Sequence, residues 1–292
     1  MITASIVTYD HHLLDIEPVL RSIFASPIDR VWIIDHSEHM MRLEEELNEF
    51  TSRVLTGESL LQEKVAKGFK IIYQKHHNNG YGGGHNVALK AAEKLGAQYH
   101  LVVNPDIWFG PRVIPALQKY MDEHEDVAQI MPKVLYPDGG IQPLAKMLPT
   151  PLDFFGRLCL PPRMIYKRNN RFELADSNYT MTLNVPYLSG CFMFFRMTTL
   201  KEIDYFDEHF FMYAEDIDIT RRLHQRYQTL YYPEIPIYHK FSRASRRSLW
   251  LFWVHTKNII MYFNKWGWFH DEERARINKQ LQEQIKHGGI PT

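Results

Sequence analysis

Residues 69–106 read "FKIIYQKHHNNGYGGGHNVALKAAEKLGAQYHLVVNPD", and this stretch decides the expected fold. Two apolar runs, at 69–74 and 99–104, have the β-branched and aromatic content of buried strands. Between them, 86–96 has the apolar spacing of a helix and ends at Gly96, a usual C-cap. A strand, a helix and a second strand in this order predict a parallel pair joined by a crossover helix.

The same alternation continues toward the N-terminus. The runs "ASIVTY" (4–9) and "RVWIID" (30–35) predict two more strands, and helices are expected over 16–24 and 41–50. The first part of the chain therefore predicts an α/β domain with a doubly wound, mostly parallel sheet.

Polar residues stand where the expected strands end. In open α/β sheets, ligands bind outside the carboxyl ends of the strands. We therefore expect the strand-ending side chains to lie together as candidate site residues. They are Thr8, Tyr9, Asp35, Asn78 and Asp106.

The stretch "HNNGYGGGHNVAL" (77–89) holds four glycines just before the expected helix. Glycine lets a backbone approach an anion closely, and a helix start points free N–H groups at it, so the stretch predicts a phosphate cradle. A partial dinucleotide-binding fingerprint is a second interpretation, with Asp106 downstream in the place of a ribose-binding acid. His85, however, stands where a third glycine is needed for close helix packing, which argues against an oxidoreductase.

The tripeptide after the last of these strands places a single carboxylate at the sheet edge. In "VVNPD" (102–106), Pro105 stops the strand and turns the side chain of Asp106 out of the sheet. A divalent ion that bridges a diphosphate needs few protein carboxylates, because phosphate oxygens and waters fill its other positions. Asp106 is therefore a candidate metal ligand, and an aspartate that merely caps a turn is the other interpretation.

A second acidic group lies in "FDEHFFMYAEDIDITRRL" (206–223). Glu215 and Asp216 begin an expected helix whose N-terminal dipole favours carboxylates, and an ordinary acidic helix start has the same appearance. The aromatic residues at 206, 210, 211 and 213 would partly bury a carboxylate and raise its proton affinity. A general base needs such tuning.

The pattern after Asp106 is looser. Further strands are expected within 127–142 and over 185–197 and 229–240, with helices over 199–206 and 214–227. The segment 143–180 is rich in Pro, Arg and Asn and has no clear period, so we expect a loop region there.

Composition excludes several classes of protein. Lys plus Arg equals Asp plus Glu at 34 each, so no global basic field favours nucleic acid and any anion site must be local. Cys159 and Cys191 are too few for a disulfide framework, which suits a reducing compartment, although counting leaves a single bridge open. The chain opens directly into a strand-like run, and we expect no signal peptide.

The most apolar segment is "LWLFWVHTKNIIMYFNKWGWF" (249–269). Polar residues at 255–258 would lie on nearly every face of a helix, which argues against a membrane-spanning segment. An aromatic-rich helix packed on the domain is one interpretation. A helix that rests on a membrane surface is the other, because its tryptophans and nearby basic residues suit a headgroup boundary.

Ordered motifs run through roughly residues 2–265. They are "SIVTYD", "WIIDHS", "NNGYGGGHNVAL", "VVNPD", "YLSGCFMFFR", "FDEHFFMYAEDIDITRRL", "YHKFSRAS" and "HTKNIIMYFNKW". In this order and spacing, the chain resembles the family 2 glycosyltransferases of the GT-A fold, and in particular their rhamnosyltransferase branch. The resemblance implies a mixed, mostly parallel sheet flanked by helices, with a C-terminal helical extension.

The resemblance also assigns residues to the donor nucleotide and sugar. It implies that Thr8 and Tyr9 flank the base and that Asp35 hydrogen-bonds it. The nucleotide's ribose and phosphates would meet Asn79, Gly80 and Asn86. The donor sugar or acceptor would lie beside Asn104, Ser189 and Gly190.

For the chemistry, the resemblance implies inversion by single displacement with Mg²⁺ or Mn²⁺. "NPD" replaces the more usual D-x-D motif, so Asp106 would be the carboxylate ligand, with His239 as a further ligand used by some relatives. Asp216 would be the general base, with Glu215 as the fallback. Three arginines after His239 would bind diphosphate oxygens or lipid headgroups, or form a solvated basic face: Arg243, Arg246 and Arg247.

The implied organisation is a glycosyltransferase domain over 1–245 and an aromatic-rich helical extension over 246–292. Within the domain, 1–110 would bind the nucleotide and 111–245 would form the acceptor side. The implied donor is a nucleotide-diphosphate sugar, with dTDP-rhamnose favoured over UDP-sugars. The implied acceptor is a glycan or a polyprenyl-diphosphate-linked glycan, in bacterial surface polysaccharide synthesis. A cytoplasmic enzyme, peripheral on the inner membrane face, is expected, and a non-catalytic nucleotide-sugar-binding protein is the alternative.

Overall fold

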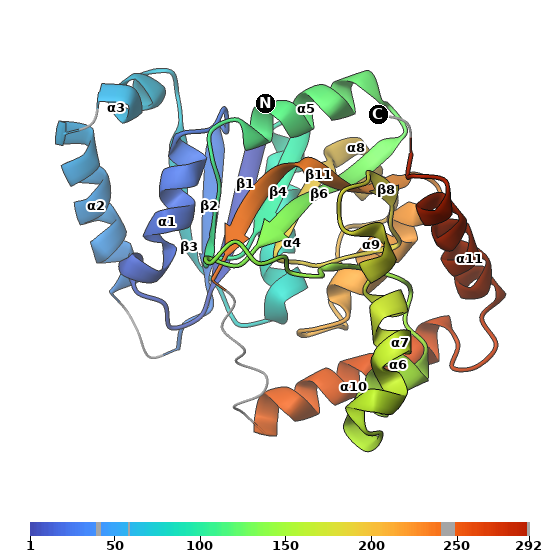
Figure 1. Cartoon of the computed structure of the whole chain (residues 1–292). Helices are drawn as coiled ribbons and strands as arrows, with labels where there is room; N and C mark the ends of the chain where they lie inside the picture. The colour runs from blue at the N-terminus through green and yellow to red at the C-terminus, as the bar shows by residue number, and fades with distance from the viewer. Residues whose placement is uncertain (39–41, 58, 241–248, 291–292) are drawn as a thin grey trace.

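The computed structural model describes residues 1–38, 42–57, 59–240 and 249–290. These residues form a nine-stranded mixed sheet in the order β3-β2-β1-β4-β10-β6-β11-β5, with β8 paired to β11 (Figure 1). The strands are β1 (Ile2–Thr8), β2 (Arg30–Asp35), β3 (Lys70–Lys75), β4 (Tyr99–Val103), β5 (Ile107–Trp108), β6 (Val127–Leu135), β8 (Leu183–Asn184), β10 (Phe192–Arg196) and β11 (Gln228–His239). A small second sheet pairs β7 (Ala145–Lys146) with β9 (Tyr187–Leu188).

The N-terminal side of the sheet is parallel, as the strand and helix pattern predicts. β1 pairs with β2 from Thr3 opposite Arg30 to Thr8 opposite Asp35, so these two strands end together. β10 is antiparallel to both β4 and β6, and it joins the parallel part to the parallel pair β6 and β11. The carboxyl ends of β1, β2 and β4 therefore form one edge that the later strands extend.

Helices cover both faces of the sheet (Figure 1). They are α1 (Leu13–Phe24), α2 (Leu43–Gly57), α3 (Ser59–Ala66), α4 (Gly80–Lys94), α5 (Val113–Glu123), α6 (Pro151–Cys159), α7 (Pro162–Phe172), α8 (Met197–Glu202), α9 (Glu215–His224), α10 (Leu249–Trp266) and α11 (Glu272–Lys286). Apolar residues of α1, α2 and α5 form the core on one face, and those of α4, α8 and α9 form the core on the other.

Strand alternation supplies both cores. On β4, Leu101 and Val103 join the core under α1 and α5, whereas Val102 joins the core under α4. β10 repeats this division, because Phe194 and Phe195 lie in opposite cores. A strand buried on both faces reads as a continuous apolar run, and this is why such runs predicted these strands.

The prediction of a loop over 143–180 is wrong, because the segment contains β7, α6 and α7. Pro151 and Pro162 stand in the first turns of α6 and α7, where a helix needs no backbone N–H donor. Thr150 and Asp153 form a capping box at the start of α6. The prolines that suggested irregular structure thus mark helix starts.

The glycine-rich stretch also differs from the expected loop, because α4 begins at Gly80 and not at Asn86. Gly82 and Gly84 are buried in the first turns of this helix. A Cβ atom at Gly82 would lie 2.9 Å from the Phe206 side chain, and one at Gly84 would lie 2.8 Å from Val7. These glycines let the helix approach its neighbours closely.

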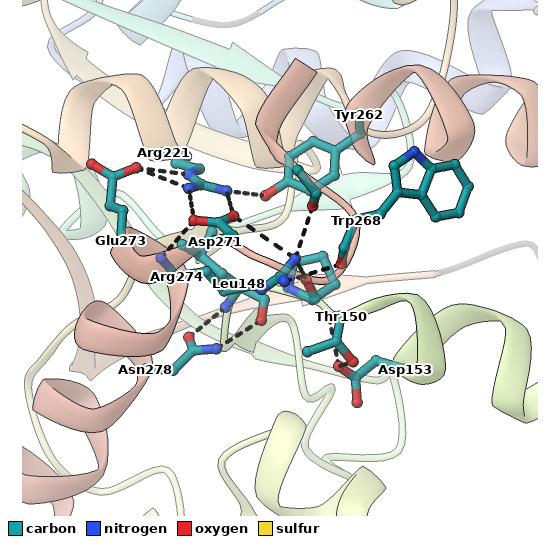
Figure 2. Close-up of polar contacts among 12 residues, drawn as sticks. Leu148, Thr150, Asp153, Arg221, Tyr262, Trp268, Asp271, Glu273, Arg274 and Asn278 are labelled. Atoms are coloured by element: carbon teal, nitrogen blue, oxygen red, sulfur yellow. Dashed lines mark hydrogen bonds and ion pairs between the residues drawn. The ribbon is translucent and has the colours of Figure 1, made fainter. Parts of the chain in front are cut away.

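The C-terminal helices are anchored to α9 by a buried ionic network (Figure 2). Arg221 on α9 is almost fully buried and donates two 2.8 Å hydrogen bonds to Asp271, and it also bonds Glu273 at 2.9 Å. Its guanidinium carbon lies 4.1 Å from the ring centre of Trp266 on α10. The extension therefore packs against the helix that begins with Glu215.

α10 is the aromatic-rich helix expected in the extension. Tyr262 and Phe263 are buried in a core shared with α9, which agrees with a helix packed on the domain. Phe154 of α6 makes an edge contact with Phe263, and Figure 1 shows α6, α7 and α10 grouped at one end of the molecule. None of the described helices has the length and apolar content to cross a membrane.

Candidate functional site

The candidate site lies along the carboxyl ends of β1, β2 and β4 and the start of α9. The backbone N–H of Asn104, just after β4, donates to the carbonyl of Cys191 at 2.9 Å, which brings the residues before β10 to this edge. Burial, and then the charges of Asp106 and Asp216, raise the pKa of the Cys191 thiol to about 12. The edge thus holds acidic residues from β4 and α9, which are far apart in the sequence.

Asp35 is a buried carboxylate beneath this edge, and hydrogen bonds from the protein engage both of its oxygens. Its side chain is 0% exposed, and its oxygens accept from Thr8 at 3.1 Å, from Tyr73 at 2.7 Å, and from the backbone N–H and hydroxyl of Ser37. The Lys75 ammonium lies 3.7 Å away. Burial alone would raise the pKa of Asp35, but these hydrogen bonds and the Lys75 charge outweigh it and lower the pKa.

The surface above Asp35 is open. Tyr9, directly after β1, has 46% of its surface exposed, so its ring is available to a flat ligand. A pocket of about 340 Å³ lies beside it at the ends of β2 and β3. It is lined by His36, Ser37, Glu38, Lys75, His76, His77 and Asn78.

The predicted nucleotide residues near α4 divide into two groups. Asn79 and Gly80 stand at the helix start, and the buried Oδ1 of Asn79 has no hydrogen-bond partner. Asn86, one helical turn into the protein, donates to the Phe206 carbonyl at 2.9 Å and to Glu208 at 2.8 Å, and it accepts from the Phe206 N–H. All of the amide's usual bonding atoms are therefore engaged by the protein, and Asn86 anchors α4 to the 206–208 segment.

Asp106 and His239, the two metal ligands that the resemblance implies, lie in contact at this edge. His239 Nε2 lies 3.2 Å from Asp106 Oδ1. Burial alone would raise the pKa of Asp106, but the contact with His239 outweighs burial and lowers it. The other ring nitrogen, Nδ1, lies 3.0 Å from Gln142 Oε1, while Gln142 Nε2 donates to the carbonyl of His239.

These contacts define the tautomer of His239. Because the Gln142 amide nitrogen faces a carbonyl, its oxygen must face Nδ1, and Nδ1 carries the proton. Nε2 then faces the Asp106 carboxylate at 3.2 Å, a contact that is favourable when a proton on Nε2 or a bound cation lies between the two atoms. Two ligands at right angles around Mg²⁺, each about 2.1 Å from the ion, lie about 3 Å apart. The donor pair therefore fits a divalent ion.

The pair does not form a complete metal site. Among the described residues, no group of three or more His, Cys, Asp or Glu side chains is placed to hold a metal ion. A hard divalent ion at Asp106 and His239 would need oxygen ligands from a bound diphosphate and from water. The chemistry of the donor set is thus that of a metal that binds together with its anionic ligand.

Glu215 and Asp216 begin α9 after a strained turn. Tyr213 and Ala214 both have left-handed backbone, with φ of 69° and 71°. Glu215 is 6% exposed and its Oε2 has no hydrogen-bond partner. Burial, and then the charge of Asp216, raise the pKa of Glu215 well above its ordinary value.

Asp216 has a different environment from Glu215. It is partly exposed, and its two oxygens accept from the backbone N–H groups of Gly190 at 3.0 Å and Ile217 at 2.8 Å. Burial raises the pKa of Asp216, while these bonds and the Lys146 charge oppose the rise. A carboxylate with a raised proton affinity that is still held in its ionised geometry has the properties of a general base.

Ser189 and Gly190, which the resemblance assigns to the donor sugar or acceptor, lie beside Asp216. The Ser189 N–H donates to the Leu144 carbonyl at 3.1 Å, and its hydroxyl accepts from the Cys191 N–H at 3.4 Å. Cys191 is a free, buried thiol. The three arginines of the expected basic cluster, Arg243, Arg246 and Arg247, lie outside the described residues.

Sequence reasoning missed several residues of the site. Gln142 and Tyr81 touch the metal pair and Gly190, respectively, through side chains that no motif singles out. Lys75, His76 and His77 line the pocket after β3. The run of basic and histidine residues just before the glycine-rich stretch was the signal that could have indicated them.

Two family sequence models match the chain. "Glycosyl transferase family 2" matches residues 4–204, and "Glycosyltransferase (GlcNAc)" matches residues 136–290. Among curated proteins, the chain is 27% identical to the N-acetylglucosaminyl-diphospho-decaprenol L-rhamnosyltransferase of Mycobacterium tuberculosis, in strains CDC 1551 / Oshkosh and ATCC 25618 / H37Rv. The match covers 58% of this chain and 58% of each relative, so it spans less than two thirds of the relatives' length.

Solved structures share the fold over most of the chain. TarS 1–349 from S. aureus has a TM-score of 0.54 at 17% identity, over 96% of this chain and 70% of that one. The mannosyltransferase PcManGT from Pyrobaculum calidifontis, in complex with GDP-Man and Mn²⁺, has 0.52 at 13% identity, over 99% and 76%. GalNAc-T7 with UDP, GalNAc and Mn²⁺ has 0.56 at 13% identity, over 82% and 43%.

Proposed function

This chain belongs to glycosyl transferase family 2 and has a GT-A-like fold, and we propose that it transfers a sugar from a nucleotide diphosphate to a hydroxyl of a growing glycan. The single observation that carries the proposal is the placement of Asp216. Backbone N–H groups hold both of its oxygens at the same sheet edge as the Asp106 and His239 pair. A general base and a diphosphate-binding pair are the two parts that such a transfer needs.

The proposed reaction is a single displacement with inversion. The acceptor hydroxyl loses its proton to a carboxylate oxygen of Asp216 as its oxygen bonds the anomeric carbon. The bond from that carbon to the diphosphate oxygen breaks, and the electron pair leaves with the diphosphate. Glu215 is the weaker candidate base, because burial favours its protonated form and it has no donor that holds one of its oxygens.

Asp106 and His239 would hold Mg²⁺ or Mn²⁺. When bound, the ion would neutralise charge on the leaving diphosphate. The two solved relatives that contain Mn²⁺ and a nucleotide or nucleotide sugar support divalent metal use in this fold. Gln142 holds the His239 ring with Nε2 toward Asp106, so this residue orients the ligand pair from outside.

The nucleotide would bind over the ends of β1, β2 and α4. We assign the exposed Tyr9 ring to the base, and the free Asn79 amide oxygen with the Gly80 backbone to the ribose and phosphates. Thr8, Asp35 and Asn86 would support this surface from beneath, since their hydrogen bonds go to the protein. Asn104, Ser189 and Gly190 would lie beside the donor sugar and the acceptor.

The name of the curated relatives supports transfer of L-rhamnose and a polyprenyl-diphosphate-linked glycan as the acceptor. The dTDP nucleotide of the favoured donor, dTDP-rhamnose, comes from the family resemblance alone. UDP-sugars remain the second donor class, and surface polysaccharide synthesis is the proposed role. A membrane-embedded acceptor suits a cytoplasmic enzyme that rests on the inner membrane face. The N-terminal turns of α10 expose Leu249, Trp250 and Trp253 by 84%, 59% and 68%, which suits a lipid headgroup boundary.

The membrane proposal has its own test. Wild-type protein is sedimented with vesicles that contain anionic lipid at low salt, beside a double variant Trp250→Ser with Trp253→Ser. Wild type should co-sediment and the double variant should remain in the supernatant. If the wild type stays in the supernatant, the proposal that α10 rests on a membrane surface is wrong, and the proposal of sugar transfer is unaffected.

Ligand-dependent thermal stability tests the function as a whole. The protein is unfolded with dTDP, UDP, GDP or NAD, each with and without Mn²⁺. A ligand at 100 times its dissociation constant stabilises by about 2.7 kcal/mol, which raises the melting temperature measurably. We expect a metal-dependent rise with dTDP or UDP. A rise with NAD alone, or none with any pyrimidine diphosphate, would contradict the proposal.

A further inference from the structure

Tyr81 connects α4 to the proposed base through the backbone of one residue, Gly190. Its hydroxyl donates to the carbonyl of Gly190 at 2.6 Å. The N–H of the same residue, Gly190, donates to Asp216 Oδ2 at 3.0 Å. The bond from Tyr81 to the Gly190 carbonyl therefore affects the position of the Gly190 N–H, and through it the Asp216 carboxylate.

Tyr81 is itself held from three directions. Its backbone N–H donates to the Phe211 carbonyl at 2.9 Å, a few residues before the strained turn into α9. Its ring makes edge contacts with His85, at a centroid distance of 4.5 Å, and with Phe206 at 6.3 Å. The phenol thus has little freedom to rotate away from Gly190.

A buried hydrogen-bond chain fixes the His85 ring beneath Tyr81. Thr3 donates to the Tyr99 carbonyl at 3.3 Å, so its oxygen accepts from His100 Nδ1 at 2.7 Å. His100 Nε2 then accepts from Ser5, whose oxygen accepts from His85 Nδ1 at 2.7 Å. Each hydroxyl has one proton, so the whole chain has one direction and the His85 ring has one orientation.

Gly190 lies between the phenol of Tyr81 and the carboxylate of Asp216. A Cβ atom built at this position would lie 3.4 Å from Asp216 Cβ and 3.4 Å from Tyr81 Cε1. Gly190 therefore lies between the two side chains, and the two hydrogen bonds hold the peptide units on either side of its Cα atom. A change in the Tyr81 bond would alter the direction of the Gly190 N–H.

We propose that Tyr81 is a positioning residue for the transfer reaction: it holds the Gly190 carbonyl and so fixes the backbone of Gly190, whose N–H holds Asp216 toward the acceptor hydroxyl. This inference rests on the proposed function. It explains why a tyrosine in the glycine-rich stretch reaches across the site to the segment that contains Gly190. Tyr81 need not touch the substrate to influence the rate.

The proposal is tested by Tyr81→Phe, which removes the hydroxyl and keeps the ring contacts. The matched control is Tyr179→Phe, because Tyr179 also donates a 2.6 Å bond to a backbone carbonyl, that of Glu173, away from the carboxylates. Initial rates are measured against donor concentration. We expect kcat to fall about tenfold for Tyr81→Phe with the donor KM within twofold of wild type, and neither to change for the control.

The pH profile supplies a readout that loss of stability would not move. Asp216 faces Glu215 on α9, Lys146 on β7 and Tyr81 on α4. A weaker Gly190 N–H bond favours the protonated carboxyl, so the acid limb of kcat/KM should move to higher pH in Tyr81→Phe only.

The outcomes separate this inference from the function on which it rests. If Asp216→Asn is inactive while Tyr81→Phe matches Tyr179→Phe in rate and pH profile, the positioning role is wrong and the function stands. A Tyr81→Phe variant with raised donor KM and normal kcat would make Tyr81 a binding residue and would also overturn the inference. If Asp216→Asn turns over normally, the assigned base is wrong, and the role of Tyr81 fails with it.

Discussion

Asp35 and the Glu215–Asp216 pair are carboxylates near one sheet edge, and their surroundings are opposite. Asp35 receives hydrogen bonds from Thr8, Tyr73 and Ser37 and lies near Lys75, and its pKa is lowered although it is fully buried. Glu215 has an oxygen without a donor, and burial raises the pKa of both members of the pair. The hydrogen-bond donors and the Lys75 charge around Asp35, and not the degree of burial, separate the direction of its pKa shift from that of the pair on α9.

The difference arises from which elements surround each group. The donors to Asp35 come from the ends of β1 and β3 and from the residues after β2, which the parallel register brings together. The pair on α9 follows a left-handed turn, and Asp216 accepts from the N–H of Gly190, from a distant segment, and from that of the next residue, Ile217. Substitutions at these carboxylates should therefore have effects of different kinds.

The largest effect is expected for Asp216→Asn. Loss of the base should lower kcat by about 10²- to 10⁴-fold, because general base catalysis contributes this much. The asparagine is of equal size and leaves the nucleotide surface unchanged, so the donor dissociation constant from calorimetry should match wild type. Turnover within a few fold of wild type would remove Asp216 from the role of base.

Asp271→Asn should mainly affect stability, because hydrogen bonds from the protein engage both oxygens of Asp271, as they do in Asp35. It pairs with Arg221, which is buried on α9 (Figure 2). Removal of one partner of a buried ion pair costs about 3 kcal/mol, and this should appear in urea unfolding. A matched exposed pair serves as control, through Glu63→Gln opposite Lys67, for which less than about 1 kcal/mol is expected.

Asp35→Asn is expected to cost about 1 to 3 kcal/mol of stability, because buried donors lose their acceptor charge. The pH dependence has a defined sign. The folded pKa of Asp35 lies below its ordinary value of 3.8, so its contribution is present above that pH and is lost as the pH falls. Unfolding measured at pH 7 and pH 3 should show a smaller difference between variant and wild type at pH 3.

Glu215→Gln should have the smallest effect and the opposite sign. The folded pKa of Glu215 is raised above 4.5, so the protonated form is favoured by folding, and stability falls as the pH rises through this range. The neutral glutamine should therefore stabilise the protein at pH 7 by on the order of 1 kcal/mol, with no gain at pH 4. Turnover of Glu215→Gln should persist. If its kcat fell as far as expected for Asp216→Asn, Glu215 and not Asp216 would be the general base.

Much of the fold followed from local patterns. Apolar runs predicted the buried strands because strands covered on both faces contain few polar residues, and the order of strands and helices predicted a parallel arrangement for the first four. The prolines at 151 and 162 were misleading because a proline in the first turn of a helix looks the same in sequence as one in a loop. The glycines of α4 were misleading in a similar way, since their close contacts are with Phe206 and Val7.

The sequence by itself determined which chemical groups reach the sheet edge, because strand ends and helix starts are local features that bring Asp35, Asp106 and Asp216 there. Only the tertiary structure decided what each group does. The donors that saturate Asp35 and the peptide that holds Asp216 come from segments distant in the chain. A hydrogen bond acts over about 3 Å, so its partners depend on how the elements pack and cannot be inferred from spacing along the sequence.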